Sequence, residues 1–173
     1  MWCNKYIGNK SGSEDSSFNN PYLCASFFVG DFMKNDDYFM RLALEEAKKA
    51  YELGEVPVGA VIILNNSVVG KGYNCKESES NCLAHAEIMA INEACGNLKS
   101  WRLNDCVLYI TMEPCSMCFG AIAESRISRI VYALSSDSKQ MFSFREDKLN
   151  NDELVNESLN LMREFFKNLR NKE

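Results

Sequence analysis

One imidazole, one carboxylate and two thiols lie in two short segments, His85-Ala86-Glu87 and Cys115-Ser116-Met117-Cys118. Each segment is predicted to open a helix directly after a loop or a strand. The spacing of the two cysteines puts both sulfur atoms on one side of a first helical turn, where free backbone N–H groups and the helix dipole favour thiolates. Such a pair is suited to binding a metal ion.

His85 and Glu87 are two positions apart, so in the middle of a helix their side chains would point to nearly opposite faces. At a helix start both can bend toward a site beyond its end. Zn²⁺ held by His85, Cys115 and Cys118 keeps a fourth position for water and lowers the pKa of that water from about 16 toward about 7. Glu87 is then expected to act as the catalytic acid and base, taking the water proton and passing it to a leaving amine.

Two other interpretations of these residues stay open. In a closed structural zinc site, Cys82 or Cys75 takes the fourth position and no water is activated, which leaves Glu87 without a role. In a zinc-stabilised interaction module, the metal supports a binding surface and there is no turnover.

The composition narrows the class of protein. A chain of 173 residues suits one domain, and its net charge of −5 argues against nucleic-acid binding by bulk electrostatics, although a locally basic surface remains compatible with it. Eight cysteines without regular spacing, in a chain with no convincing export signal, indicate reduced thiols in a cytoplasmic protein. His85 is the only histidine, which excludes any Ser-His or Cys-His mechanism that does not use it.

Residues 1–32 differ from the rest of the chain. They are mostly polar, and their apolar run is far shorter than the roughly 20 residues that a membrane span requires. We therefore expect residues 1–32 to be a disordered extension or the product of an upstream start site, and residues 33–173 to form the catalytic domain.

Hydrophobic periodicity predicts an α/β fold with three layers, in which helices cover both faces of a mixed sheet of about five strands. The metal is expected at the strand ends where the two helices that carry its ligands begin. Helices are expected over about 36–53, 83–95, 115–124 and 152–170, and strands over 58–64, 67–73, 106–112 and 129–134.

Two of the predicted helices have distinctive faces. The helix over 83–95 is apolar on nearly all sides, so it should be enclosed in the interior and stop at Gly96. The last helix carries a regular apolar stripe that should form its inner face. The residues of that stripe are Val155, Leu159, Met162, Phe166 and Leu169.

The motifs resemble those of the zinc-dependent nucleobase deaminases, in which His-x-Glu precedes Pro-Cys-x-x-Cys. Residues 55–61, 84–90, 111–118 and 125–127 are similar to the tRNA-specific adenosine deaminases of bacteria, within a resemblance over roughly residues 36–134. It implies a cytidine deaminase-like fold, one Zn²⁺ per subunit, a homodimer, and deamination of the wobble adenosine of a tRNA anticodon loop to inosine. It implies neither a membrane nor duplex DNA as a partner.

The resemblance also implies substrate-binding residues. Asn74 matches an asparagine that contacts the base, where an amide pairs with a donor and an acceptor together; the alternative is an ordinary turn asparagine. Val56 matches a position that lines the base pocket, and the alternative is a core residue. A backbone N–H of Ala84, Ala86 or Cys115 is expected to help hold the reacting atoms.

A tRNA-acting enzyme must also contact phosphates, and cations near the end of the chain are the candidates. Their alternative role is to stabilise the negative pole of a solvated helix end. The candidates are Lys139, Arg145, Lys148, Lys167, Arg170 and Lys172.

The loop after Leu134 departs from the family pattern, because it keeps Asp137 and Lys139 but lacks the usual glycines. This loop sets substrate choice in the family. A deaminase of a free base or nucleoside, such as guanine, cytosine or a riboflavin precursor, is therefore the second enzymatic hypothesis.

Overall fold

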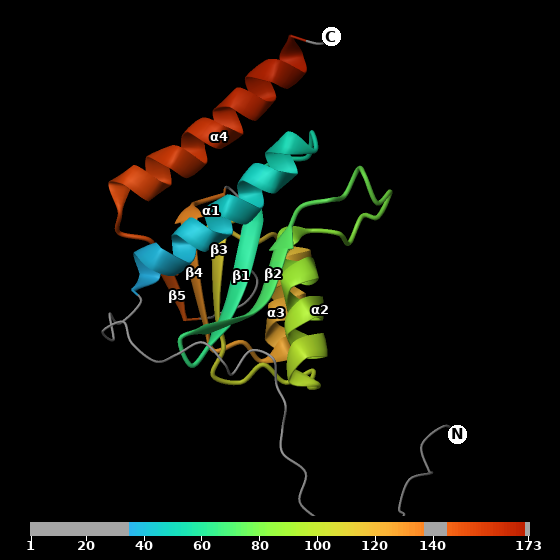
Figure 1. Cartoon of the computed structure of the whole chain (residues 1–173), viewed down its shortest axis with the longest axis vertical. Coiled ribbons are helices and arrows are strands. Elements are labelled where there is room, and N and C mark those ends of the chain that lie inside the picture. The colour runs from blue at the N-terminus through green and yellow to red at the C-terminus, as the bar shows by residue number, and fades with distance from the viewer. Residues whose placement is uncertain (1–34, 137–144, 172–173) are drawn as a thin grey trace, which may run out of the picture. The chain divides into compact units, whose positions relative to one another are not determined.

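The structure is a computed structural model that describes residues 35–136 and 145–171 (Figure 1). The expected extension over residues 1–32 lies outside the described residues, as do Lys139 and Lys172. The elements are α1 (Asp36–Glu52), β1 (Gly59–Leu64), β2 (Ser67–Tyr73), α2 (Ala86–Leu98), β3 (Val107–Met112), α3 (Ser116–Ser125), β4 (Arg129–Leu134), β5 (Glu146–Lys148) and α4 (Asp152–Arg170).

The five strands form one mixed sheet in the order β2-β1-β3-β4-β5. β1 is antiparallel to both β2 and β3, whereas β3, β4 and β5 run parallel to one another. Asn65 and Asn66 join β1 to β2 with φ values of 48° and 63°, the left-handed backbone of a tight two-residue hairpin turn. The predicted α/β fold with a mixed five-stranded sheet is confirmed.

Helices cover both faces of this sheet (Figure 1). Side chains alternate along each strand, so Ala60 and Ile62 of β1 pack with α2 and α3, while Val61 and Ile63 pack with α1 and α4. The same alternation runs through β3 and β4. The core is therefore two apolar layers divided by the sheet, and the predicted three-layer arrangement is confirmed.

Glycines on β2 bring α2 unusually close to the sheet. A Cβ atom at Gly72 would lie 2.2 Å from the carbonyl oxygen of Ala86 and 2.6 Å from the nitrogen of Ala90. Gly70 meets Ala90 and Ala94 in the same way. Because the first turn of α2 rests on the backbone of β2, the position of the residues at its start is determined by the sheet.

The prediction for α2 was wrong in two respects. The helix continues through Gly96 to Leu98, and it is Lys99, with φ of 50°, that takes the left-handed conformation at its end. The helix is not enclosed either, because Asn92 and Glu93 are exposed. Its many apolar residues serve close packing on one face of the sheet.

The predicted inner face of α4 was wrong at its far end, although Val155 packs against the core as expected. The buried residues of α4 are Leu154 and Ser158, in its first two turns. Phe166 and Leu169 are 40% and 48% exposed, because the second half of the helix extends away from the sheet (Figure 1). The apolar stripe identifies an amphipathic helix correctly, but only the first turns of α4 are packed on the core.

Within the described residues, the structure contains no helix that combines the length and the apolar character needed to cross a membrane.

Candidate metal centre and active site

Two helix starts meet at one end of the sheet. His85 is the N-cap residue of α2 and Cys115 is the N-cap residue of α3, both in extended backbone conformation, and neither side chain makes a capping hydrogen bond. Cys118 follows in the first turn of α3 and is fully buried. Both N-cap side chains are therefore available to a site between the helices.

The distances among these three side chains fit a zinc ion. The Nδ1 atom of His85 lies 3.8 Å from the sulfur of Cys115 and 3.6 Å from that of Cys118, and the two sulfurs are 3.7 Å apart. Tetrahedral zinc with Zn–S bonds of about 2.3 Å and a Zn–N bond of about 2.0–2.1 Å requires separations of about 3.8 Å between sulfurs and about 3.6 Å from sulfur to nitrogen. Nδ1 is thus the ligand atom that His85 offers.

The ionisation of these groups suits a cation between them. Burial, together with the charge of Lys76, lowers the pKa of His85 and favours the neutral imidazole that binds metals. Burial raises the pKa of the Cys118 thiol, and the nearby Glu87 and Cys115 raise it further. A divalent cation reverses that cost by stabilising the thiolate directly.

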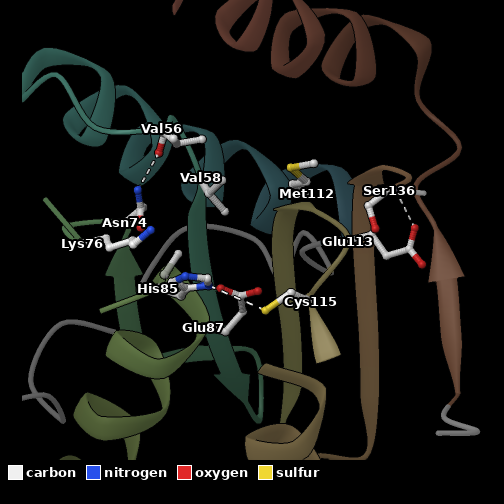
Figure 2. A pocket seen from close by; sticks show the side chains of 11 residues that line it. Val56, Val58, Asn74, Lys76, His85, Glu87, Met112, Glu113, Cys115 and Ser136 are labelled. Atoms are coloured by element: carbon white, nitrogen blue, oxygen red, sulfur yellow. Dashed lines mark hydrogen bonds between the residues drawn. The ribbon is translucent and has the colours of Figure 1, made fainter. Parts of the chain in front are cut away.

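Glu87 lies beside the cluster, in the first turn of α2, and is 4% exposed. Burial raises the pKa of its carboxyl to about 7, against the opposing effect of hydrogen bonds from its own backbone and from Cys118. A carboxyl with a pKa near neutrality can both accept and release a proton, which is what general acid–base catalysis requires. Figure 2 shows its carboxylate directed into the same cavity as His85 and Cys115.

A cavity of about 320 Å³ opens above the cluster, at the low end of the range for small-molecule sites. It is bordered by the start of β1, the ends of β2, β3 and β4, and the two helix starts. The predicted placement of the site at strand ends therefore agrees with the geometry. Its lining residues are Val56, Val58, Asn74, Lys76, His85, Ala86, Glu87, Met112, Glu113, Cys115 and Ser136.

Asn74 and Val56 form one wall of this cavity (Figure 2). Asn74 is 7% exposed, and its amide nitrogen donates to the carbonyl oxygen of Val56 at 3.3 Å and to a carboxylate oxygen of Glu55 at 3.4 Å. The amide nitrogen of Asn74 therefore has two acceptors within the protein. The expectation that this amide offers a donor and an acceptor together is not met in this arrangement.

Of the three residues whose backbone N–H is expected to help hold the reacting atoms, Ala86 and Cys115 line the cavity and Ala84 does not. Ala84 is buried outside the cavity lining, and its N–H donates to the carbonyl oxygen of Asn81 at 3.0 Å. Its own carbonyl accepts from the N–H of Cys75 at 3.0 Å. Ala84 therefore closes the loop before α2, and both its N–H and its carbonyl are paired within the protein.

The closed zinc site with a fourth cysteine is contradicted among the described residues. His85, Cys115 and Cys118 are the group whose ligand atoms gather within 4.8 Å of one another, and neither Cys75 nor Cys82 belongs to it. Cys75 is buried with its sulfur 3.9 Å from the Ala84 carbonyl, and Cys82 is exposed.

The described phosphate-contact candidates do not line the cavity. Arg145 lies beside the start of β4, because its carbonyl accepts from the N–H of Ile130 at 3.1 Å, and Lys148 pairs with Tyr132 within the sheet. Lys167 and Arg170 lie on the last turns of α4. Among the described cations, Lys76 alone is part of the cavity lining.

Sequence reasoning missed several residues of the site. Lys76 lies two residues after Asn74, and Glu113 precedes the Pro-Cys motif, so proximity to a motif was the available signal for both. Ser136, whose N–H donates to the Glu113 carboxylate at 2.7 Å, carried no such signal. Glu55, which contacts Asn74 and the loop after β2, was noted only as part of a motif.

Comparison with known families agrees with this geometry. The model of the cytidine and deoxycytidylate deaminase zinc-binding region matches residues 33–134. That range includes every residue of the metal cluster and Glu87.

Individual proteins are similar to this chain over different fractions of its length. The tRNA-specific adenosine deaminase of Bacillus subtilis (strain 168) is 46% identical over 100 residues, which span 58% of this chain and 62% of that protein. The protein of the same name from Buchnera aphidicola subsp. Baizongia pistaciae is 40% identical over 147 residues, 79% of this chain and 91% of that protein. A chain solved in a study of A-to-I editing by tRNA:A34 deaminases at the wobble position has 33% identity and a TM-score of 0.66, covering 72% of this chain and 99% of its own length.

Proposed function

The chain belongs to the cytidine and deoxycytidylate deaminase family, and from that premise we propose that it deaminates adenosine to inosine at the wobble position of transfer RNA. The observation that carries the proposal is the set of three ligand atoms at zinc-binding distances with Glu87 in the same cavity. The names of its relatives supply the substrate.

We assign one Zn²⁺ per subunit to His85, Cys115 and Cys118. When bound, this ion supplies a Lewis acid that activates water at neutral pH. Glu87 accepts a proton at its carboxylate and delivers protons to the purine ring and to the departing amine, so that ammonia leaves. Asn74 and Val56 hold the base against the opposite wall of the cavity.

Contact with RNA phosphates requires cations, and the amphipathic helix α4 carries two of them in its last turns. Lys167 and Arg170 lie beside the exposed Phe166, so the end of α4 presents both charges for phosphates and an aromatic ring for stacking. Asn168 donates to the hydroxyl of Tyr51 at 3.0 Å, which places these turns beside the end of α1 that leads to Val56. Arg145 and Lys148 are the weaker candidates, because they lie along β5.

The remaining features of the proposal follow from the resemblance to the bacterial tRNA-specific adenosine deaminases. The chain acts in the cytoplasm, on an anticodon loop whose unstacked adenosine enters the cavity, and as a homodimer. Residues 33–173 form the deaminase domain.

The test is incubation of the purified zinc-loaded protein with an anticodon stem-loop RNA, followed by detection of inosine. Glu87→Gln keeps the volume and the zinc ligands, so it should retain zinc and lose activity by about 100-fold or more. Glu124→Gln, the same change at an exposed position of α3, is the matched control and should behave as wild type.

Two results would redirect the assignment. Ammonia release from free guanine, cytosine or a nucleoside, without inosine in the RNA, would favour the free-base deaminase. Retention of zinc and of all cellular function by Glu87→Gln would favour a zinc-stabilised interaction module.

A further inference from the structure

A buried carboxylate connects the end of α1 to the active-site loop. Glu55 is 1% exposed and accepts hydrogen bonds from the backbone N–H groups of Ser78, at 2.6 Å, and Glu77, at 3.2 Å. Burial raises the pKa of its carboxyl, but the hydrogen bonds from Ser78 and Glu77 and the charge of Lys76 together lower it by more, so the net pKa lies below its usual value. The ionised Glu55 carboxylate therefore holds the loop after β2 in place by accepting hydrogen bonds from its backbone N–H groups.

Residues of the active site lie at both ends of this loop. It begins after Asn74 and ends at His85, and the hydrogen bond from Cys75 N–H to the Ala84 carbonyl closes its base. Contact with Glu55 thus restrains a wall of the cavity and the approach to a zinc ligand together.

The same carboxylate also contacts Asn74 itself. The amide nitrogen of Asn74 has two hydrogens, and its two acceptors are Glu55 and the carbonyl of Val56. Figure 2 shows this nitrogen pointing at Val56. The amide group has only one other polar atom, its oxygen Oδ1, and an amide oxygen accepts hydrogen bonds.

We propose that Glu55 is a positioning residue that turns the amide nitrogen of Asn74 into the protein, so that this wall of the cavity presents Oδ1 and recognises a hydrogen-bond donor on the substrate. This inference rests on the proposed function, because it takes the cavity to hold the target nucleotide. The ring nitrogens N3 and N7 of adenine are acceptors and do not pair with Oδ1. The exocyclic amine and the ribose 2′-hydroxyl are donors and do.

A residue swap tests the direction of this hydrogen bond. Asn74→Asp keeps an acceptor toward the cavity but sets two buried carboxylates against each other, so kcat/KM on the stem-loop RNA should fall by about 100-fold. The double variant Glu55→Gln/Asn74→Asp restores one amide and one carboxylate with the hydrogen bond reversed. The new carboxylate at position 74 then faces the carbonyl oxygen of Val56, and the new amide at position 55 has one acceptor oxygen fewer for the N–H of Glu77. The double variant should therefore recover kcat/KM only partly, by about 10-fold over Asn74→Asp, because the repulsion between two carboxylates is removed.

The controls separate this role from general loss of structure. Asn92→Asp makes the same chemical change at an exposed position of α2 and should leave kcat/KM unchanged. Zinc content should stay at the wild-type level in all variants. A double variant no more active than Asn74→Asp, with zinc retained, would overturn the inference, as would an Asn74→Asp variant with wild-type activity.

A measurement on the wild-type zinc protein needs neither folded variants nor turnover. The side-chain amide protons of Asn74 should exchange slowly with solvent by NMR, because both are hydrogen-bonded inside the protein. Fast exchange would contradict the proposed orientation. Failure of the proposed function is distinguishable, because it would show as absence of inosine with the wild-type protein.

Discussion

The four helices begin in two different ways. α1 and α4 start at Asn35 and Asn151, whose side-chain oxygens accept hydrogen bonds from the backbone N–H three residues later, at 3.0 and 3.2 Å. α2 and α3 start at His85 and Cys115, whose side chains make no capping bond. A favoured N-cap residue contributes about 1 kcal/mol to helix stability, so α2 and α3 forgo a contribution that α1 and α4 receive.

The difference follows from what each helix start must do. At α2 and α3 the N-cap position is the one from which a side chain reaches past the helix end, so it carries a zinc ligand. Those helices are held by packing instead, as the contact of Gly72 with Ala86 shows. Local stability rules are most often broken at functional sites and compensated nearby.

Removing a zinc ligand should have the largest effect. Cys118→Ala should abolish stoichiometric zinc binding, measured by elemental analysis, and reduce inosine formation below detection, because only two protein ligands remain. Cys95→Ala, at a partly buried thiol outside the cluster, is the control and should retain zinc and activity. Full zinc content in Cys118→Ala would contradict the assigned ligand set.

The second test concerns the packing that replaces the caps. Gly72→Ala should destabilise the protein by about 2 kcal/mol and weaken zinc binding, because the new methyl group displaces the first turn of α2. Gly96→Ala, in the same helix with open space around it, should instead stabilise the protein by about 0.5–1 kcal/mol. Urea unfolding and zinc titration measure both effects, and equal behaviour of the two variants would refute the role of Gly72.

A third test exchanges the two kinds of helix start. His85→Ser installs a favoured N-cap residue on α2, so in chelator the variant should be more stable than metal-free wild type by about 0.5–1 kcal/mol, although it no longer binds zinc. Asn151→Ala should lose about 1 kcal/mol and keep both zinc and activity. Denaturant unfolding measures these changes. A His85→Ser variant less stable than metal-free wild type would show that His85 supports the fold on its own.

The same contrast explains which features were predictable from sequence. Ligand identity and helix starts are local properties, so His85, Glu87 and the two cysteines could be identified as candidates from their spacing together with the family motif. The strands β1, β3 and β4 could be recognised because their apolar runs reflect burial on both faces of a sheet. The edge strand β2 could be recognised because the Asn65-Asn66 turn joins it to β1. The polar β5, Glu146–Lys148, has no such pattern because it is a short strand at the edge of the sheet.

The packing partners of α4 and the orientation of the Asn74 amide could be known only from the structure. Periodicity showed that α4 is amphipathic, yet it could not show that Leu154 is buried while Phe166 and Leu169 are not. Motif matching selected Asn74, but the direction of its amide depends on Glu55, which is distant in sequence and close in space. Such properties arise from tertiary contacts that a single sequence does not display.

The smallest expected effect is the change in protein stability at low pH that results from protonation of Asp36, in the first turn of α1. Hydrogen bonds from Arg129 lower the pKa of Asp36, against the opposing effect of burial, and the Tyr109 hydroxyl lowers it further. Because the folded-state pKa lies below the ordinary value of 3.8, this contribution to stability is fully present above that value and is lost as pH falls through the folded-state pKa.

Asp36→Asn should therefore reduce stability near neutral pH and flatten its loss as pH falls below about 4, by a small amount because the Asp36 side chain is 39% exposed. Unfolding curves are best compared in the Cys118→Ala background, where protonation of the zinc site does not contribute. Glu124→Gln is the control for removing a carboxylate that lies outside this network. If Asp36→Asn and its background lose stability in parallel as pH falls, the pairing with Arg129 does not stabilise α1, and its start depends on the Asn35 cap alone.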